Sequence, residues 1–201
     1  MNTHTLPLAA SPDPERRVWL LATGAAGGMA VAATAIPFVS SLAPSQRARA
    51  QGAAVEVDIS DLPPGGSKTV EWRGKPVWIM RRTPEMLAAL PALDGQLADP
   101  KSLREQQPAY AQNAWRSVKP EIFVAVGICT HLGCSPSAVP AGSANPSVGA
   151  DWPGGFFCPC HGSTFDVAGR VFRNKPAPSN LEIPPHRFAS ETRLLIGDEE
   201  A

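Results

Sequence analysis

A chain of 201 residues has room for one globular domain and an appendage, but not for two domains of ordinary size. Its 18 basic residues balance 18 acidic ones, so the net charge gives no electrostatic reason to expect nucleic acid as a partner. The 22 prolines and 17 glycines follow no period, which excludes a collagen-like repeat and favours short strands joined by tight turns.

An uncharged apolar run lies near the N-terminus, from Val18 to Val39. As a helix it would extend about 33 Å, enough to cross the hydrocarbon core of a membrane, which is roughly 30 Å thick. A buried core helix is the alternative, but core helices ordinarily keep a polar face and this run has none. We therefore predict a transmembrane helix over residues 18–39.

Two arginines, Arg16 and Arg17, directly precede the apolar run. By the positive-inside rule they predict that residues 1–17 form a cytoplasmic tail. The stretch around them resembles a twin-arginine export signal, with Trp19 where such signals usually carry Phe. Such signals export proteins that have already folded, which suits a protein that receives a cofactor before export.

A cleavable signal peptide is the alternative for this N-terminal segment. Ala48-Arg49-Ala50 is similar to a cleavage site, but the apolar run is longer than the usual 7–15 residues. We therefore expect the helix to be retained as an anchor. Residues 40–54 are small and polar and are predicted to form a flexible tether.

The remainder, residues 55–201, is predicted to be a mostly β domain. Thr83 and Pro84 suit the N-cap and first position of a brief helix. Residues 91–118 give no clear pattern beyond a turn of helix after Asp99-Pro100. Alternation with a period of two, or a short apolar run, predicts strands over residues 55–59, 69–72, 76–80, 122–128 and 156–157.

All four cysteines lie in two short loops, each of which follows one of the apolar strands. Two of the four histidines lie there too, which disulfides alone would not explain. A structural zinc site of two cysteines and two histidines remains open, but it would leave two cysteines without a role. The loops are box 1, Cys129-Thr130-His131-Leu132-Gly133-Cys134, and box 2, Cys158-Pro159-Cys160-His161-Gly162-Ser163.

The pattern C-T-H-L-G-C followed by C-P-C-H-G-S resembles the two cluster-binding boxes of the Rieske iron–sulfur family. Within this family, the chain is similar to the disulfide-containing form, which is the iron–sulfur subunit of quinol–cytochrome c oxidoreductases. The resemblance extends to the twin-arginine anchor, the tether and Lys175-Pro176-Ala177-Pro178. It implies an all-β Rieske domain of antiparallel sheets with an inserted cluster-binding subdomain, at about residues 122–181, plus one N-terminal transmembrane helix.

The resemblance implies one Rieske-type 2Fe–2S cluster as the cofactor. Cys129 and Cys158 would bind one iron as thiolates, and His131 and His161 would bind the other as imidazoles. Because the imidazoles are neutral, Rieske centres have raised reduction potentials, roughly −150 to +300 mV.

Other residues of the two boxes have roles that the resemblance implies. Cys134 and Cys160 would form a disulfide, which a location outside the cytoplasm permits. Ser163 would donate a hydrogen bond to a cluster sulfur and raise the potential. Gly133 and Gly162 would let backbone N–H groups approach the cluster.

One position departs from the family pattern. High-potential members usually carry Tyr at the second residue after the serine of box 2, and its hydroxyl bonds a ligand sulfur. Phe165 stands there and has no hydroxyl. We expect the cluster to have a lower potential than in relatives with Tyr.

The surface around the cluster is expected to dock on partner proteins. The loop Lys175–Pro178 would cover the third side of the cluster. Leu132, Gly133, Lys175 and Pro176 would form the docking rim, with Leu132 and the Pro176 loop as its apolar part.

The implied activity is that of an oxidoreductase subunit, which oxidises ubiquinol in a reaction coupled to proton translocation. His161 would accept the hydrogen bond of the quinol hydroxyl. The expected partners are cytochrome b and a membrane-bound c-type cytochrome, in a dimeric complex. The expected location is the cell inner membrane, with a single span and the globular domain on the periplasmic side.

Two other functions would account for part of the pattern. A Rieske ferredoxin or oxygenase domain generally lacks the extra cysteine pair and an anchor, so Cys134, Cys160 and residues 18–39 argue against it. The alternative that remains is the Rieske small subunit of an inorganic-substrate oxidoreductase such as arsenite oxidase, which can share the signal and the disulfide.

Overall fold

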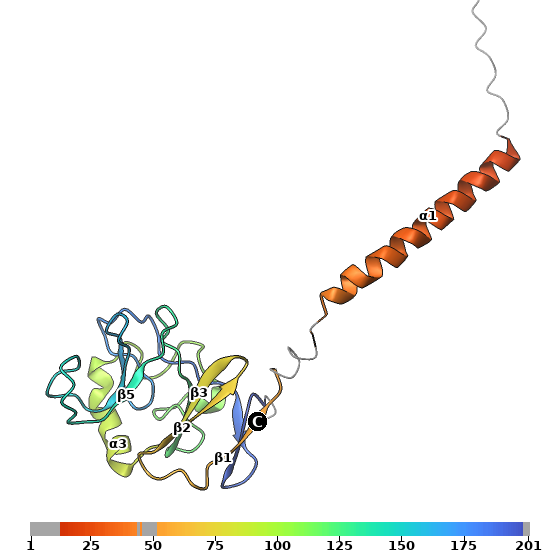
Figure 1. Ribbon diagram of the computed structural model, residues 1–201. Helices are drawn as coiled ribbons and strands as arrows, with labels where there is room; N and C mark the ends of the chain where they lie inside the picture. The colour runs from red at the N-terminus through yellow and green to blue at the C-terminus, as the bar shows by residue number, and fades with distance from the viewer. Residues whose placement is uncertain (1–12, 44, 46–51, 199–201) are drawn as a thin grey trace, which may run out of the picture. The chain divides into compact units, whose positions relative to one another are not determined.

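The computed structural model describes residues 13–43, 45 and 52–198, and the chain divides into two compact units, Met1–Arg49 and Ala50–Ala201 (Figure 1). The described part of the first unit is dominated by one helix, and the second holds the strands. Most of the predicted cytoplasmic tail, about half of the tether and the candidate cleavage site Ala48-Arg49-Ala50 lie outside the described residues.

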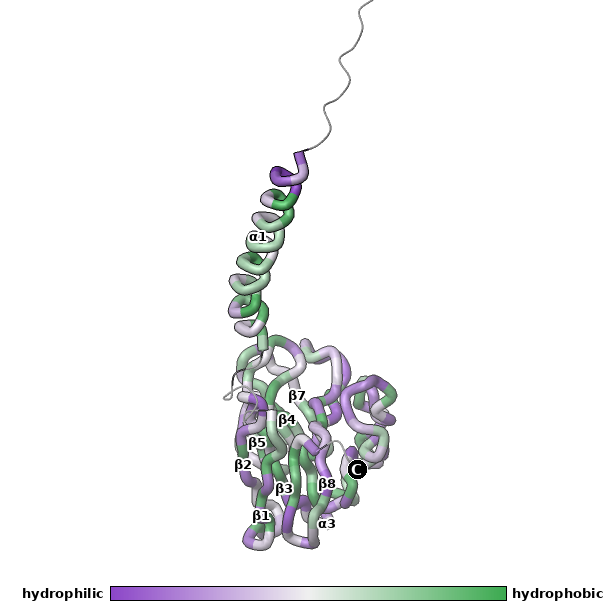
Figure 2. Tube along the Cα trace, turned by 90° about the vertical axis from the view of Figure 1, so that its right-hand side faces the viewer, coloured by the Kyte–Doolittle hydropathy of each residue, from purple (hydrophilic) through white to green (hydrophobic). Residues whose placement is uncertain are grey.

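The N-terminal helix, α1 (Pro14–Ser41), contains the whole predicted segment 18–39 and has no buried residue. It is long and apolar enough to cross a membrane, and Figure 2 shows hydrophobic colouring along most of it. Its two threonines, Thr23 and Thr34, donate hydrogen bonds of 2.8 and 2.6 Å to backbone carbonyls one turn earlier. In a hydrocarbon environment, polar groups need hydrogen-bond partners within the protein, and these two hydroxyls have them.

Within the described residues, the globular unit contains three antiparallel sheets of three strands each. The first has the order β1 (Val55–Asp58), β9 (Arg193–Ile196), β8 (His186–Phe188); the second β2 (Ser67–Trp72), β3 (Lys75–Arg81), β4 (Ile122–Val126); the third β5 (Ser137–Val139), β6 (Gly155–Phe157), β7 (Thr164–Phe165). The predicted fold class, a β domain of antiparallel sheets, is confirmed.

Strand β4 lies between two hydrophobic cores, and all five of its residues are buried. Successive side chains of a strand point to opposite faces, so alternate residues enter different cores. Ile122, Val124 and Val126 pack with the first sheet, whereas Phe123 and Ala125 pack with the third sheet and the cysteine boxes. Figure 2 shows the hydrophobic colouring of β3 and β4. This double burial makes β4 a fixed support for box 1.

Helical structure in the globular unit is short. Thr83 caps α3 (Pro84–Ala89), as predicted, and its hydroxyl accepts a hydrogen bond from the backbone N–H of Met86 at 3.3 Å. The 3-10 helices η1 (Leu90–Gln96) and η2 (Ala109–Ala111) were not predicted. The helical turn expected after Asp99-Pro100 is wrong: the Asp99 carboxylate instead accepts backbone hydrogen bonds within a loop.

Candidate metal centre

Boxes 1 and 2 fold into two separate loops of the same conformation. In each, the first cysteine donates its backbone N–H to the carbonyl of the last residue of the box, at 2.7 Å in box 1 and 2.8 Å in box 2. The glycine N–H of each box donates back to the carbonyl of the first cysteine, at 3.1 and 3.0 Å. Gly133 and Gly162 have φ angles of 84° and 75°, which L side chains rarely adopt. The conformation of the loop therefore requires glycine at both positions.

An aromatic pair joins β6, which leads to box 2, to β3, which pairs with the strand β4 that leads to box 1. Trp78 of β3 stacks on Phe156 of β6, with ring centroids 4.9 Å apart. The same indole passes so close to Gly127, between β4 and box 1, that a Cβ there would lie 2.3 Å from it. Box 1 can therefore lie this close to box 2 only because residue 127, which contacts Trp78, is a glycine.

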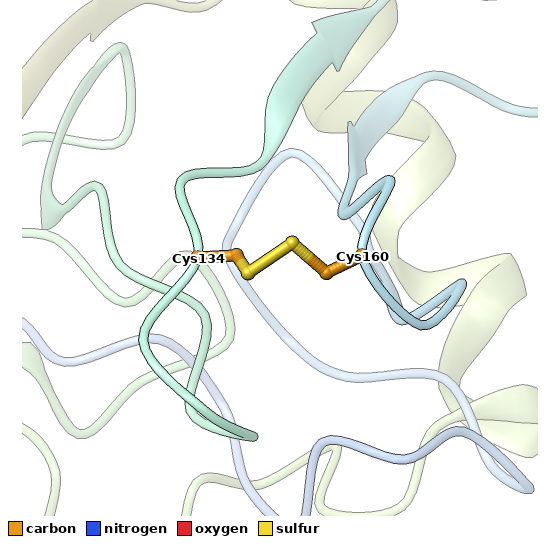
Figure 3. The surroundings of a disulfide bond; sticks show 2 residues. All are labelled: Cys134 and Cys160. Atoms are coloured by element: carbon orange, nitrogen blue, oxygen red, sulfur yellow. A yellow bond between two sulfur atoms is a disulfide. The ribbon is translucent and has the colours of Figure 1, made fainter.

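The four cysteines divide into two pairs. Cys134 and Cys160 form a disulfide between the boxes, with an S–S distance of 2.10 Å and Cα atoms 6.6 Å apart (Figure 3). Cys129 and Cys158 are free thiols and are buried. The structure thus forms the disulfide that the sequence resemblance implied and leaves the two predicted ligand cysteines as free thiols.

The two histidines of the boxes lie face to edge. The imidazole rings of His131 and His161 have centroids 4.8 Å apart and planes at 88°. His131 Nδ1 is buried and has no hydrogen-bond partner among the described residues. A buried polar atom without a partner is costly. Binding of a metal by this nitrogen would remove that cost, so the residues present fit a centre with two thiolate and two imidazole ligands.

The hydroxyl of Ser163 lies against the thiol of Cys129. Burial raises the pKa of the Cys129 thiol, and hydrogen bonds from the backbone N–H of His131 and the hydroxyl of Ser163 act in the opposite direction. Ser163 itself is fully buried. The structure therefore places this hydroxyl at the sulfur of Cys129, a predicted ligand, and the donor role of Ser163 remains a prediction.

The proline loop is joined to both boxes. The backbone N–H of Ala177 donates to the Ser163 hydroxyl of box 2 at 3.0 Å. The Thr130 hydroxyl of box 1 donates to the backbone carbonyl of Ser179 at 2.6 Å. These two bonds fix the loop Lys175–Pro178 beside the boxes, as expected, whereas Thr130 was not singled out from the sequence.

The expected docking residues are exposed. Leu132 at the tip of box 1 is 70% exposed, a large fraction for an aliphatic side chain. Gly133, Lys175 and Pro176 are exposed as well. His161 is exposed whereas His131 is only partly so, which makes His161 the more accessible imidazole.

Phe165 lies in the core that surrounds the ligand cysteines. It is fully buried in β7, pairs with Phe156 of β6, and belongs to the same hydrophobic cluster as Cys129 and Cys158. The position that carries Tyr in high-potential relatives is therefore an interior one here, and it offers no hydroxyl.

Buried arginines stabilise the segments that follow box 2, and sequence reasoning missed them. Arg170 forms an ion pair with Asp166 at 2.7 Å, and both side chains are almost fully buried. Arg116, also buried, donates to backbone carbonyls that include that of Leu181 at 2.6 Å. Burial lowers the pKa of Arg116 to about 10. Since arginine is usually exposed, no sequence signal marked these positions.

Comparison with known families agrees with this geometry. The Rieske [2Fe-2S] domain family matches residues 53–185, and the family described as "Ubiquitinol-cytochrome C reductase Fe-S subunit TAT signal" matches residues 8–45. The ubiquinol-cytochrome c reductase iron-sulfur subunit of Allochromatium vinosum is 55% identical over 92% of this chain and 88% of its own length. The chain belongs to this family of Rieske iron–sulfur subunits.

Further relatives show the spread of the family. The corresponding subunit of Bradyrhizobium diazoefficiens is 41% identical over 94% of this chain and 98% of its own length. The mitochondrial cytochrome b-c1 complex Rieske subunit of Solanum tuberosum is 41% identical over 92% of this chain and 63% of its own length. A solved "Hyperthermophilic respiratory Complex III" chain has 27% identity and a TM-score of 0.46, covering 89% of this chain and 98% of that one.

Family membership decides between the cofactors that the sequence left open. The cofactor is a 2Fe–2S cluster of the Rieske type, so the zinc and disulfide-only interpretations are wrong. The arsenite oxidase alternative is not favoured, because the relatives named above are subunits of ubiquinol–cytochrome c reductase and of the cytochrome b-c1 complex. The individual ligand assignments remain predictions, supported by the burial and proximity described above.

Proposed function

We propose that this chain oxidises ubiquinol and passes the electrons to a membrane-bound c-type cytochrome. The observation that carries the proposal is the exposure of two residues, His161 of box 2 and Leu132 of box 1 (70% exposed), on a fold shared with subunits of ubiquinol–cytochrome c reductase. An apolar side chain of this size exposed next to a candidate ligand is suited to a docking contact.

Four side chains would hold the cluster. Cys129 and Cys158 supply two thiolates from buried positions, while His131 and His161 supply imidazoles from the outer side. When bound, the Rieske 2Fe–2S cluster supplies one-electron chemistry at a raised potential. The burial of the cysteines excludes water from one side of the site. His161 lies on the exposed side, which a quinol can reach.

His161 would also take part in proton transfer. Quinol oxidation releases protons as well as electrons, so a base is needed beside the hydroxyl. The imidazole nitrogen that faces away from the iron can accept the hydrogen bond of the quinol hydroxyl and then hold its proton. Leu132 and Pro176, which are both exposed, would exclude water from the contact.

The N-terminal helix would anchor the subunit in the cell inner membrane. Arg16 and Arg17 at the start of α1 favour a cytoplasmic N-terminus, so the globular unit would lie on the periplasmic side. Cytochrome b would carry the quinol site against which the boxes dock, in a dimeric complex. The tether predicted over residues 40–54, of which Ser40 and Ser41 belong to α1 in the structure, would let the globular unit move from cytochrome b to the c-type cytochrome.

The docking surface can be tested by rapid mixing of ubiquinol with membranes that contain the complex. Leu132→Ser should slow reduction of the cluster roughly tenfold, since loss of an apolar contact worth about 1.5 kcal/mol corresponds to that factor. Val118→Ser is the matched control, because Val118 is an exposed aliphatic residue (45%) outside the boxes and the proline loop. Equal rates in the two variants, with the EPR signal of the cluster intact in both, would refute the proposed docking.

A further inference from the structure

Three sulfur atoms meet between the two boxes. The Sγ atoms of Cys134, Cys158 and Cys160 all lie within 4.8 Å of one another. Two of them form the disulfide, and the third is a buried free thiol. Disulfides rearrange when a thiolate attacks one of their sulfurs, and the rate depends on access to that sulfur. A potential attacking group therefore lies beside the bridge.

We propose that loss of the cluster allows Cys158 to attack this disulfide, so that the bridge moves from Cys134–Cys160 to Cys134–Cys158. While iron holds the Cys158 sulfur, that sulfur is not free to form a new bond. The cluster thereby protects the native bridge. The proposal rests on Cys158 being an iron ligand, and it does not depend on which donor reduces the cluster.

The exchange needs no external oxidant or reductant. The sulfur of Cys158, having released its proton, forms a bond with the sulfur of Cys134. The Cys134–Cys160 bond breaks, and its electron pair leaves with the sulfur of Cys160, which takes up a proton. One disulfide and one thiol are present before and after. The separation between the sulfurs is one that side-chain rotation can cover.

Exposure favours Cys160 as the leaving group. Of the two bridge cysteines, Cys160 is exposed whereas Cys134 is only partly exposed, so a thiol released from Cys160 emerges into solvent. The new pair is only two residues closer in sequence than the native pair, whose separation is 26, so the constraint on the unfolded chain is nearly unchanged. Attack on Cys160 instead would join near neighbours in one loop and release the two boxes from each other.

The exchange would make loss of the cluster persistent. The rearranged chain has lost one of its thiolate ligands to the new disulfide, so it cannot rebind two irons until a reductant opens that bond. The same reasoning sets an order of assembly. The cluster must be inserted before the bridge closes, because a bridged chain without the cluster rearranges.

Two full-length variants that each lack one proposed ligand separate this reaction from general unfolding. Cys129→Ser keeps the attacking thiol, and Cys158→Ser removes it. Each is purified without reductant, alkylated, digested and analysed for linked peptides by mass spectrometry. We expect a Cys134–Cys158 link with alkylated Cys160 in the first variant, and the native Cys134–Cys160 link in the second.

The wild-type protein provides the second measurement. With its cluster it should show only the native link, and after removal of iron by a chelator the Cys134–Cys158 link should accumulate. Iron and sulfide should then restore the EPR signal only after treatment with a dithiol. If the bridge stays native in Cys129→Ser and in the chelated wild-type chain, the proposal is wrong. Quinol oxidation enters neither readout, so failure of the proposed function would leave this test intact.

Discussion

The backbone N–H of Ala177 donates a hydrogen bond of 3.0 Å to the hydroxyl of Ser163, and both residues are buried. A hydroxyl that accepts one bond still has its own hydrogen to donate. The neighbouring acceptor is the sulfur of Cys129, whose pKa this hydroxyl lowers against the larger opposing effect of burial. The proline loop thus orients a donor toward a candidate ligand.

Replacement of Ser163 by Ala should lower the reduction potential. A hydrogen bond to the cluster environment stabilises the reduced state more than the oxidised state, by about 1 kcal/mol or on the order of 40 mV for one electron. The change also leaves the Ala177 N–H without its partner. Protein-film voltammetry gives the potential, with Ser135→Ala, at an exposed serine just after box 1, as the control. An unchanged potential would mean that the hydroxyl points away from the cluster.

Replacement of Phe165 by Tyr should raise the potential by a similar amount, about 40 mV, if the new hydroxyl bonds a ligand sulfur. Phe165 shares its hydrophobic cluster with Cys129 and Cys158, so the added oxygen enters their surroundings. Phe172→Tyr adds the same hydroxyl beside Trp152, whose ring centroid is 5.6 Å away, and should leave the potential unchanged. Equal potentials in the two variants would contradict the assigned effect of Phe165.

Removal of the bridge with the double change Cys134→Ser and Cys160→Ser should destabilise the globular unit. In the chain-entropy model, a crosslink over 26 residues contributes about 3 kcal/mol. The thermal midpoint and the rate of cluster loss on heating would report it. The double variant is preferable to either single one because it leaves no new thiol. A midpoint equal to that of the wild type would show that the bridge has no stabilising role.

His186 should make the globular unit less stable in mild acid. Burial lowers the pKa of His186 below its ordinary value of 6.5, and its hydrogen bond with the Pro184 carbonyl only partly opposes this. As the pH falls below about 6.5, His186 binds a proton in the unfolded chain but not yet in the folded chain. The free energy of unfolding therefore decreases.

The variant His186→Phe should flatten that decrease. Its ring keeps the contact with Tyr110, whose ring centroid lies 5.6 Å from that of His186. Thermal midpoints measured between about pH 8 and pH 5.5 would show the difference, and titration of other groups cancels between the two proteins. Parallel curves would assign the acid sensitivity to other residues.

Strands β1 to β4, strand β6 and the capped helix could be predicted because their signals are local, whereas strands β5, β7, β8 and β9 of the described residues were not predicted. Alternation over residues 55–59 reflects one buried face of β1, and Thr83 caps α3 through a residue three positions away. Residues 91–118 could not be predicted because their contacts are distant in sequence. Arg116 bonds the carbonyl of Leu181, and Asn180 bonds that of Asp99. No short window of sequence contains both partners.

The candidate site was predicted from box spacing and family resemblance, and the structure adds what surrounds it. The boxes marked the cysteines and histidines because metal ligands need those residue types. Neither the bond from Thr130 to Ser179 nor the ion pair of Asp166 with Arg170 has such a signature. Each involves residue types that are common on protein surfaces, and only folding places them beside the boxes.

The central claim is that two imidazoles and two thiolates of the boxes bind the 2Fe–2S cluster. Pulsed EPR spectroscopy of the reduced full-length protein tests it most directly, because it detects nitrogen bound to iron. The account predicts coupling to two imidazole nitrogens, from His131 and His161, whose rings lie 4.8 Å apart. A signal without nitrogen coupling would contradict the account, and so would the absence of any signal from protein that retains its metal.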